Sequence, residues 1–141
     1  MGTVIKIGTT LERKLIVKET DCISFLGKDV KPSLASPCMI AHMEVTARDA
    51  VLPHLAEGQD TVGTHVDVSH LGATPLGDEV TYKAVVTAVD GRKITFDVEA
   101  VDSRETVGRG AHERYVIDIE RFARGLRPLR LANPHVWERR R

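Results

Sequence analysis

The sequence predicts an α+β fold in which one long helix is wrapped by a curved, five-stranded antiparallel sheet. The first observation is a single strong helical pattern, over residues 37–52. The second is a set of segments rich in β-branched residues with alternating polarity, at residues 9–18, 61–71, 79–89, 92–102 and 105–119. The third is the Asp90-Gly91 dipeptide between two of these segments, which is typical of a tight hairpin. One helix cannot cover both faces of such a sheet, so we expect the sheet to curve around it.

The helix is predicted from its start signal and its apolar spacing. Ser36 is a favourable N-cap residue, and Pro37 suits the first helical position. Apolar residues then recur at steps of three and four: Met39, Ile40, Met43, Ala47, Ala50 and Val51. We expect the helix to end at Pro53 or soon after, because proline interrupts a helix.

The segments after the helix predict four strands in a meander. In residues 61–71 the alternation places a set of side chains on one face: Val62, Thr64, Val66, Val68 and His70. Gly108 and Gly110 interrupt the last strand, which predicts a bulge or a close approach of another part of the chain. Residues 19–35, before the helix, are mixed in character and are expected to form a loop that can hold a short helix or strand.

Length and composition are those of one ordinary globular domain. The chain has 141 residues, of which 42% are hydrophobic and 28% charged. We expect a single domain over residues 1–141, with a core over about 1–120 and an arginine-rich tail over 121–141. Residues 120–141 contain seven arginines against two glutamates, a net charge of +5. Such a tail could reach phosphate groups or simply be solvated.

Charge and hydropathy argue against several function classes. Twenty basic and twenty acidic side chains cancel, which argues against strong global attraction to nucleic acid or to an anionic membrane. No apolar run approaches the roughly 18 residues of a membrane span. The first residues lack the basic and apolar blocks of a secretion signal. We therefore expect a cytoplasmic protein with reduced cysteines.

No metal site and no cofactor are expected. Cys22 and Cys38 are too few for a disulfide framework or a zinc site. The six histidines, at positions 42, 54, 65, 70, 112 and 135, show no metal-ligand spacing. The sequence also lacks the P-loop, GxGxxG and GxSxG motifs.

Three side chains are candidates for chemistry, and each has a structural alternative. His70 ends an alternating strand just before a Gly/Pro turn, where it suits acid–base work or a structural hydrogen bond. Glu44 lies near the apolar helix face, where a carboxylate needs a partner, or it is exposed and paired with Arg48 four residues on. Ser36 caps the helix or contributes a hydroxyl at a helix N-terminus, and its position alone favours the cap.

Four separated motifs resemble the fluoroacetyl-CoA thioesterase family of hot-dog proteins. They are SPCMIAHMEV, GTHVDVSHLGATPLG, VVTAVDGRKITFDVEAVD and GRGAHERYVI, and the resemblance covers roughly residues 34–120. It implies a hot-dog fold, a homodimer, and hydrolysis of the thioester of a small or medium acyl-CoA. Residues around 20–33 do not match the family, so specificity for fluoroacetyl is not carried over.

The resemblance also implies a set of site residues. The catalytic hydroxyl falls on Ser36, the helix glutamate on Glu44 and the strand histidine on His70. A glycine near the thioester carbonyl falls on Gly63, and an arginine near the active site falls on Arg114. Pro37 stands where the family has glycine, which could stiffen the helix start.

A thioesterase must polarise the thioester carbonyl while a nucleophile attacks it. We expect backbone N–H groups to hold the developing oxyanion, and His70 to act as general base and acid. Glu44 would orient His70, activate water or attack the carbonyl, and Ser36 would donate a hydrogen bond or act as nucleophile. Candidates for the CoA phosphates are Arg114, Arg121, Arg124 and Arg127.

The spacing of these residues constrains the site. Ser36 and Glu44 are eight residues apart, about 12 Å along a regular helix, which is beyond hydrogen-bond reach. Either His70 bridges them, or the helix begins after Ser36, or the site is shared between subunits. We favour a site at the interface of a homodimer, with pairing of dimers into tetramers left open. Two other functions are also left open, namely a hot-dog hydratase or dehydratase and a non-catalytic acyl-CoA-binding protein.

Overall fold

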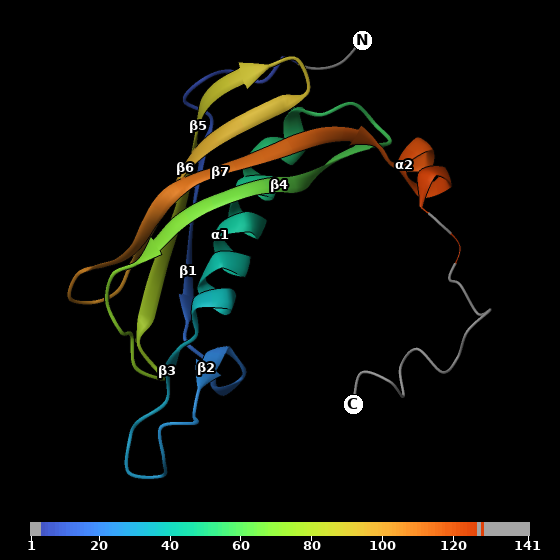
Figure 1. Cartoon of the computed structure of the whole chain (residues 1–141). Coiled ribbons are helices and arrows are strands. Elements are labelled where there is room, and N and C mark those ends of the chain that lie inside the picture. Colours follow the sequence, from blue (N-terminus) through green and yellow to red (C-terminus); the bar gives the residue numbers. More distant parts are fainter. Residues whose placement is uncertain (1–3, 127, 129–141) are drawn as a thin grey trace.

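The five-stranded sheet curves around a single long helix, as predicted (Figure 1). The computed structural model describes residues 4–126 and 128. The sheet is antiparallel, in the order β1-β5-β6-β7-β4. Its strands are β1 (Thr10–Ile16), β4 (Gln59–His70), β5 (Glu79–Asp90), β6 (Lys93–Val101) and β7 (Thr106–Asp118). Helix α1 (Ser36–Val51) lies in the concave side of the sheet, which confirms the α+β class.

Short elements complete the described chain. A 3-10 helix (Glu19–Asp21) and the paired strands β2 (Cys22–Ile23) and β3 (Ser33–Leu34) occupy the segment predicted as a loop. A second 3-10 helix (Leu52–His54) follows α1, and α2 (Ile119–Gly125) follows β7. Most of the predicted arginine-rich tail, residues 127 and 129–141, lies outside the described residues. No helix in the described ranges is long and apolar enough to cross a membrane.

The core forms where α1 packs on the concave face of the sheet. Met39, Met43 and Val51 from the helix are almost fully buried against Tyr82 and Phe96 from the strands. Burying a side chain of this size stabilises the fold by about 1.5–3 kcal/mol.

Gly108 and Gly110 allow two close approaches, as predicted. A Cβ at Gly108 would lie 2.5 Å from Sδ of Met39, so the glycine lets α1 sit directly on β7. A Cβ at Gly110 would collide with the backbone of Asp67 and Val68 in the neighbouring strand. These glycines therefore allow the sheet and helix to pack closely.

The predicted meander of four strands is wrong. Strands β5, β6 and β7 follow one another as neighbours, but β4 pairs with β7 instead of β5. Strand β1 already pairs with one edge of β5, and β6 pairs with the other. Strand β4 therefore adds to the free edge of β7, and it becomes an edge of the sheet.

The predicted alternation in β4 is also wrong in its first half. The register with β7 shifts between Gly63 and His65, because one extra residue bulges from β4. A bulge reverses the face on which the following side chains lie. Thr61 and Gly63 therefore face the helix together with Val66, Val68 and His70, whereas Val62 and Thr64 do not share that face.

Candidate functional site

Ser36 and His70 form a hydrogen-bonded pair where α1 begins. Ser36 Oγ lies 2.6 Å from Nδ1 of His70, which ends β4. We call these two residues the amino-end pair. Ala35, not Ser36, is the N-cap residue, and no side chain caps the helix. The predicted cap role of Ser36 is therefore wrong, because its side chain is directed to His70. Pro37 accordingly stands second in the helix, one position later than predicted.

The amino-end pair borders an open groove of about 530 Å³. Apolar side chains of Ile23, Phe25 and Leu71 line the same groove. The second ring nitrogen of His70, Nε2, is shielded from solvent, and no described residue forms a hydrogen bond with it. A buried ring nitrogen without a partner is unusual in a folded protein. The pair therefore combines a hydroxyl, an imidazole with one unused nitrogen, and space for an apolar group.

Glu44 belongs to a second polar group at the middle of α1. Its Oε1 lies 3.7 Å from Nη1 of Arg114 and 3.7 Å from Nε2 of His112. We call Glu44, Thr61, His112 and Arg114 the mid-helix cluster. The alternative partner, Arg48, forms its ion pairs with Asp49 and Asp60. Glu44 thus has charged and polar neighbours inside the molecule, and the alternative pairing with Arg48 is wrong.

Gly63 leaves room for the carboxylate of Glu44. A Cβ at this position would lie 2.5 Å from Oε1 of Glu44 and 3.2 Å from Cε1 of His112. Real Cβ atoms do not approach an oxygen so closely, so any side chain here would displace Glu44. Gly63 and Arg114 are also direct partners in the pairing of β4 with β7. The structure thus brings three of the predicted site residues together.

The buried guanidinium of Arg114 is held by Thr61. Its Nε donates to Thr61 Oγ1 at 2.7 Å, and its Nη2 donates to the carbonyl oxygen of Thr61 at 2.8 Å. Burial lowers the pKa of Arg114, but a guanidinium stays charged in proteins. The cluster therefore presents a fixed positive charge to Glu44.

Hydrogen bonds define the tautomer of His112. Its Nδ1 lies 2.7 Å from the carbonyl oxygen of His65, which can only accept, so Nδ1 carries the proton. Nε2 can then accept from Nη1 of Arg114 at 3.2 Å. Burial lowers the pKa of His112, which favours the neutral ring that this arrangement requires.

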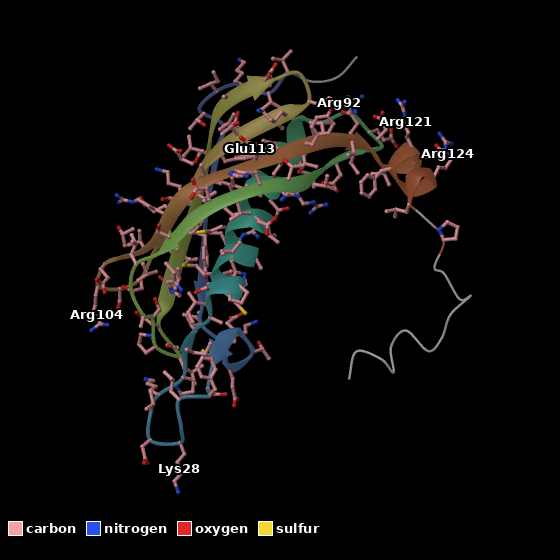
Figure 2. All side chains as sticks on the ribbon, viewed as in Figure 1. Lys28, Arg92, Arg104, Glu113, Arg121 and Arg124 are labelled. Atoms are coloured by element: carbon pink, nitrogen blue, oxygen red, sulfur yellow. The ribbon has the colours of Figure 1, made fainter. Side chains whose placement is uncertain are left out.

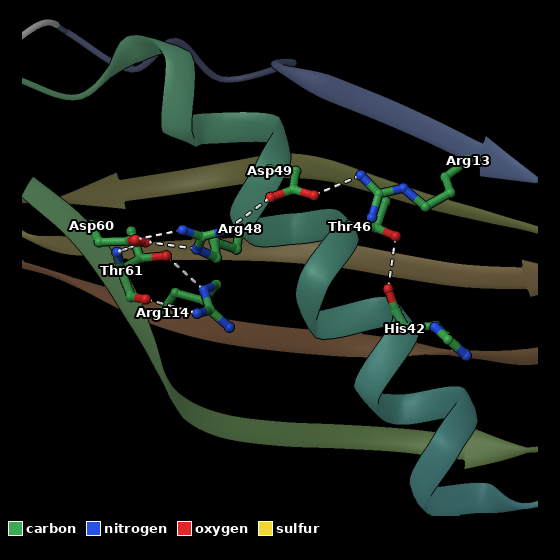
Figure 3. A network of polar contacts seen from close by, with 8 residues as sticks. All are labelled: Arg13, His42, Thr46, Arg48, Asp49, Asp60, Thr61 and Arg114. Carbon is green, nitrogen blue, oxygen red and sulfur yellow. Dashed lines mark hydrogen bonds and ion pairs between the residues drawn. The ribbon is translucent and has the colours of Figure 1, made fainter. Parts of the chain in front are cut away.

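A chain of ion pairs anchors the mid-helix cluster to the end of α1 (Figure 3). Arg48 donates two hydrogen bonds to Asp60, at 2.9 and 2.6 Å. These bonds lower the pKa of Asp60, which directly precedes Thr61 in β4. Arg13 of β1 pairs with Asp49 at 2.6 Å, so the chain of pairs reaches the opposite edge of the sheet. This network holds Thr61, and through it Arg114, in place.

Sequence reasoning did not include His112 or Thr61 in the site. A period of two in the last strand could have found His112, because it alternates with Gly110 and Arg114 on the face towards the helix. Thr61 carries no comparable signal, since its role depends on pairing with a distant strand.

The amino-end pair and the mid-helix cluster do not meet within one chain. Ser36 and Glu44 both lie in the regular helix α1, so a later helix start is excluded. His70 does not bridge them, because its Nε2 has no partner among the described residues. Within the described residues, the structure therefore shows neither a later helix start nor a bridge through His70.

The described residues offer no group of three or more metal-ligating side chains. Cys22 and Cys38 are both free thiols and half-buried.

Comparisons with known proteins identify relatives of this chain. A family model described as fluoroacetyl-CoA-specific thioesterase matches residues 17–120. The prediction that residues around 20–33 do not match the family is therefore wrong. The fluoroacetyl-CoA thioesterase of Streptantibioticus cattleyicolor is 39% identical over 88 residues, which cover 62% of this chain. The match spans 63% of the length of that protein, which is less than two thirds of it.

Solved structures show the same architecture. A structure of the fluoroacetyl-CoA thioesterase FlK superposes with a TM-score of 0.79 at 29% identity, covering 89% of this chain and 99% of that chain. A hot-dog-like protein from Thermanaerovibrio acidaminovorans superposes with a TM-score of 0.76 at 25% identity, covering 94% of this chain and 91% of the other. These matches confirm the predicted hot-dog fold and the predicted family resemblance.

Proposed function

Because the chain belongs to the fluoroacetyl-CoA-specific thioesterase family, we propose that it hydrolyses a small or medium acyl-CoA to the free acid and CoA. The observation that carries this proposal is the 2.6 Å hydrogen bond between Ser36 and His70 beside an apolar groove. Variants of the related FlK enzyme have been solved with fluoroacetate and CoA and with acetyl-CoA, which supports a small acyl group.

In the proposed mechanism, His70 acts as the general base and acid, and Glu44 acts on the same bound thioester from the mid-helix cluster. An imidazole can both accept and return a proton, which is what a general acid–base group must do. Ser36 keeps the ring of His70 oriented and offers its hydroxyl to the substrate. Glu44, held beside the charge of Arg114, activates water or attacks the carbonyl. If water attacks, its proton passes to Glu44 or His70, the C–S bond breaks and the thiolate of CoA takes up the proton. If Glu44 attacks, the thiolate leaves as the acyl group forms an anhydride with Glu44, and water then hydrolyses this anhydride to the free acid.

We propose that two copies of the chain complete the site by pairing their β4 strands. Residues 63–67 of β4 are exposed along this edge of the sheet, and exposed strand edges readily pair with another chain. Antiparallel pairing about Val66, counted across the bulge, would bring Val68 of one copy opposite Gly63 of the other and His70 opposite Thr61, on the face that carries Glu44. A homodimer of this kind joins the two polar groups that one chain keeps apart.

We further propose that the protein works in the cytoplasm. The two free thiols, Cys22 and Cys38, support a reducing compartment. The acyl-CoA class of substrate is also consistent with this location.

A thiol-release assay with the purified protein tests the proposed function. Acyl-CoA esters of increasing chain length and substitution should give free CoA, with the highest kcat/KM for a small or medium acyl group. His70→Ala and Glu44→Ala should each lower turnover about a hundredfold or more, the scale of acid–base groups. His54→Ala, a half-buried histidine beyond the end of α1, is the matched control and should behave as wild type.

Two outcomes would contradict this proposal. Turnover close to wild type in both variants would remove the catalytic roles of His70 and Glu44. Tight binding of acyl-CoA without thiol release would favour the non-catalytic binding protein instead.

A further inference from the structure

The groove beside the amino-end pair has two walls that come from distant parts of the chain. Residues 33–37, which include β3 and the start of α1, form the first wall, and residues 70–73, at the end of β4, form the second. Ser36 belongs to the first wall and His70 to the second, so their 2.6 Å hydrogen bond joins the two walls. The separation of the walls therefore decides how the two proposed catalytic side chains meet.

Thr74 is the residue at which the backbone joins the two walls. It directly follows the second wall, and its carbonyl oxygen accepts the N–H of Leu34 in the first wall at 2.8 Å. A β-bridge between Ser33 and Pro75 lies beside this contact. Leu34 comes only two residues before Ser36, so the position of Thr74 is passed on to the start of α1.

The side chain of Thr74 is fixed by a buried carboxyl group. Its hydroxyl donates to Oδ2 of Asp102 at 2.9 Å, and the two residues are 0% and 7% exposed. The other oxygen of Asp102, Oδ1, accepts the backbone N–H groups of Arg104 and Glu105 at 2.8 and 2.9 Å. Figure 2 shows Arg104 in this turn between β6 and β7, at one end of the sheet. Asp102 therefore ties the groove to a turn that two long strands hold in place.

The sheet does not need the bond between Thr74 and Asp102 to keep its own geometry. The turn is closed by the N–H of Asp102, which donates to the carbonyl oxygen of Glu105 at 2.9 Å. Just beyond β4, the N–H of Leu71 donates to the carbonyl oxygen of Val107 in β7 at 2.6 Å. What the side-chain bond adds is a fixed separation between the sheet and the first wall of the groove.

We propose that Thr74 and Asp102 are positioning residues for thioester hydrolysis, which set the separation of Ser36 and His70 and the width of the groove for the acyl group. The inference rests on the proposed function, and it names two residues that do not line the groove themselves. Catalytic groups lose much of their effect when they are displaced by about 1 Å. A pocket of altered size also selects acyl groups of different size, so the pair should act on both turnover and acyl selectivity.

Nuclear magnetic resonance of the histidine rings tests the inference without any turnover. Thr74→Val keeps the shape of the side chain but removes the hydroxyl, which leaves Oδ2 of Asp102 without a hydrogen bond from any described residue. The second wall should then shift, and the Nδ1 signal of His70 should move in the direction in which Ser36→Ala moves it. Thr74→Ser keeps the hydroxyl and should restore the wild-type signal. The signal is assigned by its absence in His70→Ala.

Thr46→Val is the matched control. Thr46 is also fully buried, and its hydroxyl donates to the carbonyl oxygen of His42 within α1 at 2.7 Å. Neither of these two residues lines the groove. The control variant thus loses a buried hydroxyl and its hydrogen bond at another place in the core, so it measures the effect of lower stability alone. Its His70 signal should stay where it is in the wild type.

Kinetics with a series of acyl-CoA esters measure the effect on selectivity. Thr74→Val should lower kcat for the preferred ester about tenfold. It should also lower the ratio of kcat/KM for that ester to kcat/KM for a longer ester about threefold, because the groove is no longer held at one width. Lower stability reduces the amount of active enzyme for every ester equally and leaves this ratio unchanged. Thr46→Val should therefore keep the wild-type ratio, and Thr74→Ser should restore it.

Thr74→Ala is a second test variant, because it leaves space for a water molecule beside Asp102 and keeps the measurement possible if the valine variant does not fold. An unmoved His70 signal in the variants of Thr74 that fold would overturn the proposal, and so would an equal movement in Thr46→Val. An unchanged acyl selectivity, with thioester hydrolysis present, would also overturn it. Failure of the wild type to hydrolyse any acyl-CoA would instead contradict the proposed function, because the resonance experiment does not depend on turnover.

Discussion

The amino-end pair and the mid-helix cluster are two polar groups on one helix, and they are built in opposite ways. Ser36 and His70 share one hydrogen bond at the rim of a groove, and His70 Nε2 has no further partner in the described chain. Glu44, by contrast, lies against a buried arginine and a buried histidine that are themselves held by Thr61 and His65.

The difference means that the mid-helix cluster is the prearranged half of the proposed site and that the amino-end pair is its open half, with bonding capacity left over. The mid-helix cluster needs no ligand to hold its geometry, because each buried group already has a partner. In the amino-end pair, Nε2 of His70 can still form a hydrogen bond with a group from outside the chain. We infer that the substrate, or a second subunit, supplies what His70 lacks, and the predictions below test this contrast.

Ser36→Ala should separate function from helix capping. The variant should lose turnover about a hundredfold, because the hydroxyl beside His70 is removed. Its free energy of unfolding should change by less than about 0.5 kcal/mol, since Ser36 is exposed and caps nothing. Thiol release and denaturant unfolding measure the two quantities. Intact turnover with a stability loss of about 1 kcal/mol would instead restore the cap role.

Gly63→Ala should disturb the prearranged half. The added Cβ would meet Glu44 Oε1, so the carboxylate must move and turnover should fall about tenfold. Gly125→Ala is the matched control, because a Cβ there meets nothing within 4 Å. Unchanged turnover in Gly63→Ala would show that the position of Glu44 is not critical.

The neutral ring of His112 should make the mid-helix cluster sensitive to acid. Because burial lowers the pKa of His112 below its ordinary value of 6.5, the unfolded chain takes up this proton before the folded chain does. The stabilisation is fully present above about pH 6.5 and is lost as pH falls from there towards the folded-state pKa. Thermal unfolding between about pH 8 and about pH 5 should therefore show a steeper fall in Tm for wild type than for His112→Asn. Parallel curves would contradict the assignment.

Elements with local signals could be predicted from the sequence. The helix expected over residues 37–52 spans Ser36–Val51, and the Asp90-Gly91 turn joins β5 to β6. The pattern of alternation also located each long strand to within two residues. These features depend on neighbours in sequence, so the sequence alone carries the information.

Features that depend on distant partners could not be predicted. The pairing of β4 with β7 follows from which strand edges are free once β1 has paired with β5. The bulge after Gly63 changes the face of every earlier residue in β4, yet it alters no short-range pattern. Ser36 carries the same signal whether its hydroxyl caps a helix or bonds to a histidine, and only His70, 34 residues away, decides between them.

The central claim is that Glu44 of one subunit and His70 of another act on the same substrate, and mixed dimers test it most directly. His70→Ala and Glu44→Ala chains, each nearly inactive alone, are unfolded together and refolded, and the mixed dimer is confirmed by mass spectrometry. If the site is shared, each mixed dimer has one intact site of two, and random mixing should restore about a quarter of wild-type activity. If both residues act within one chain, every site carries a mutation, and the mixture will be no more active than its parents.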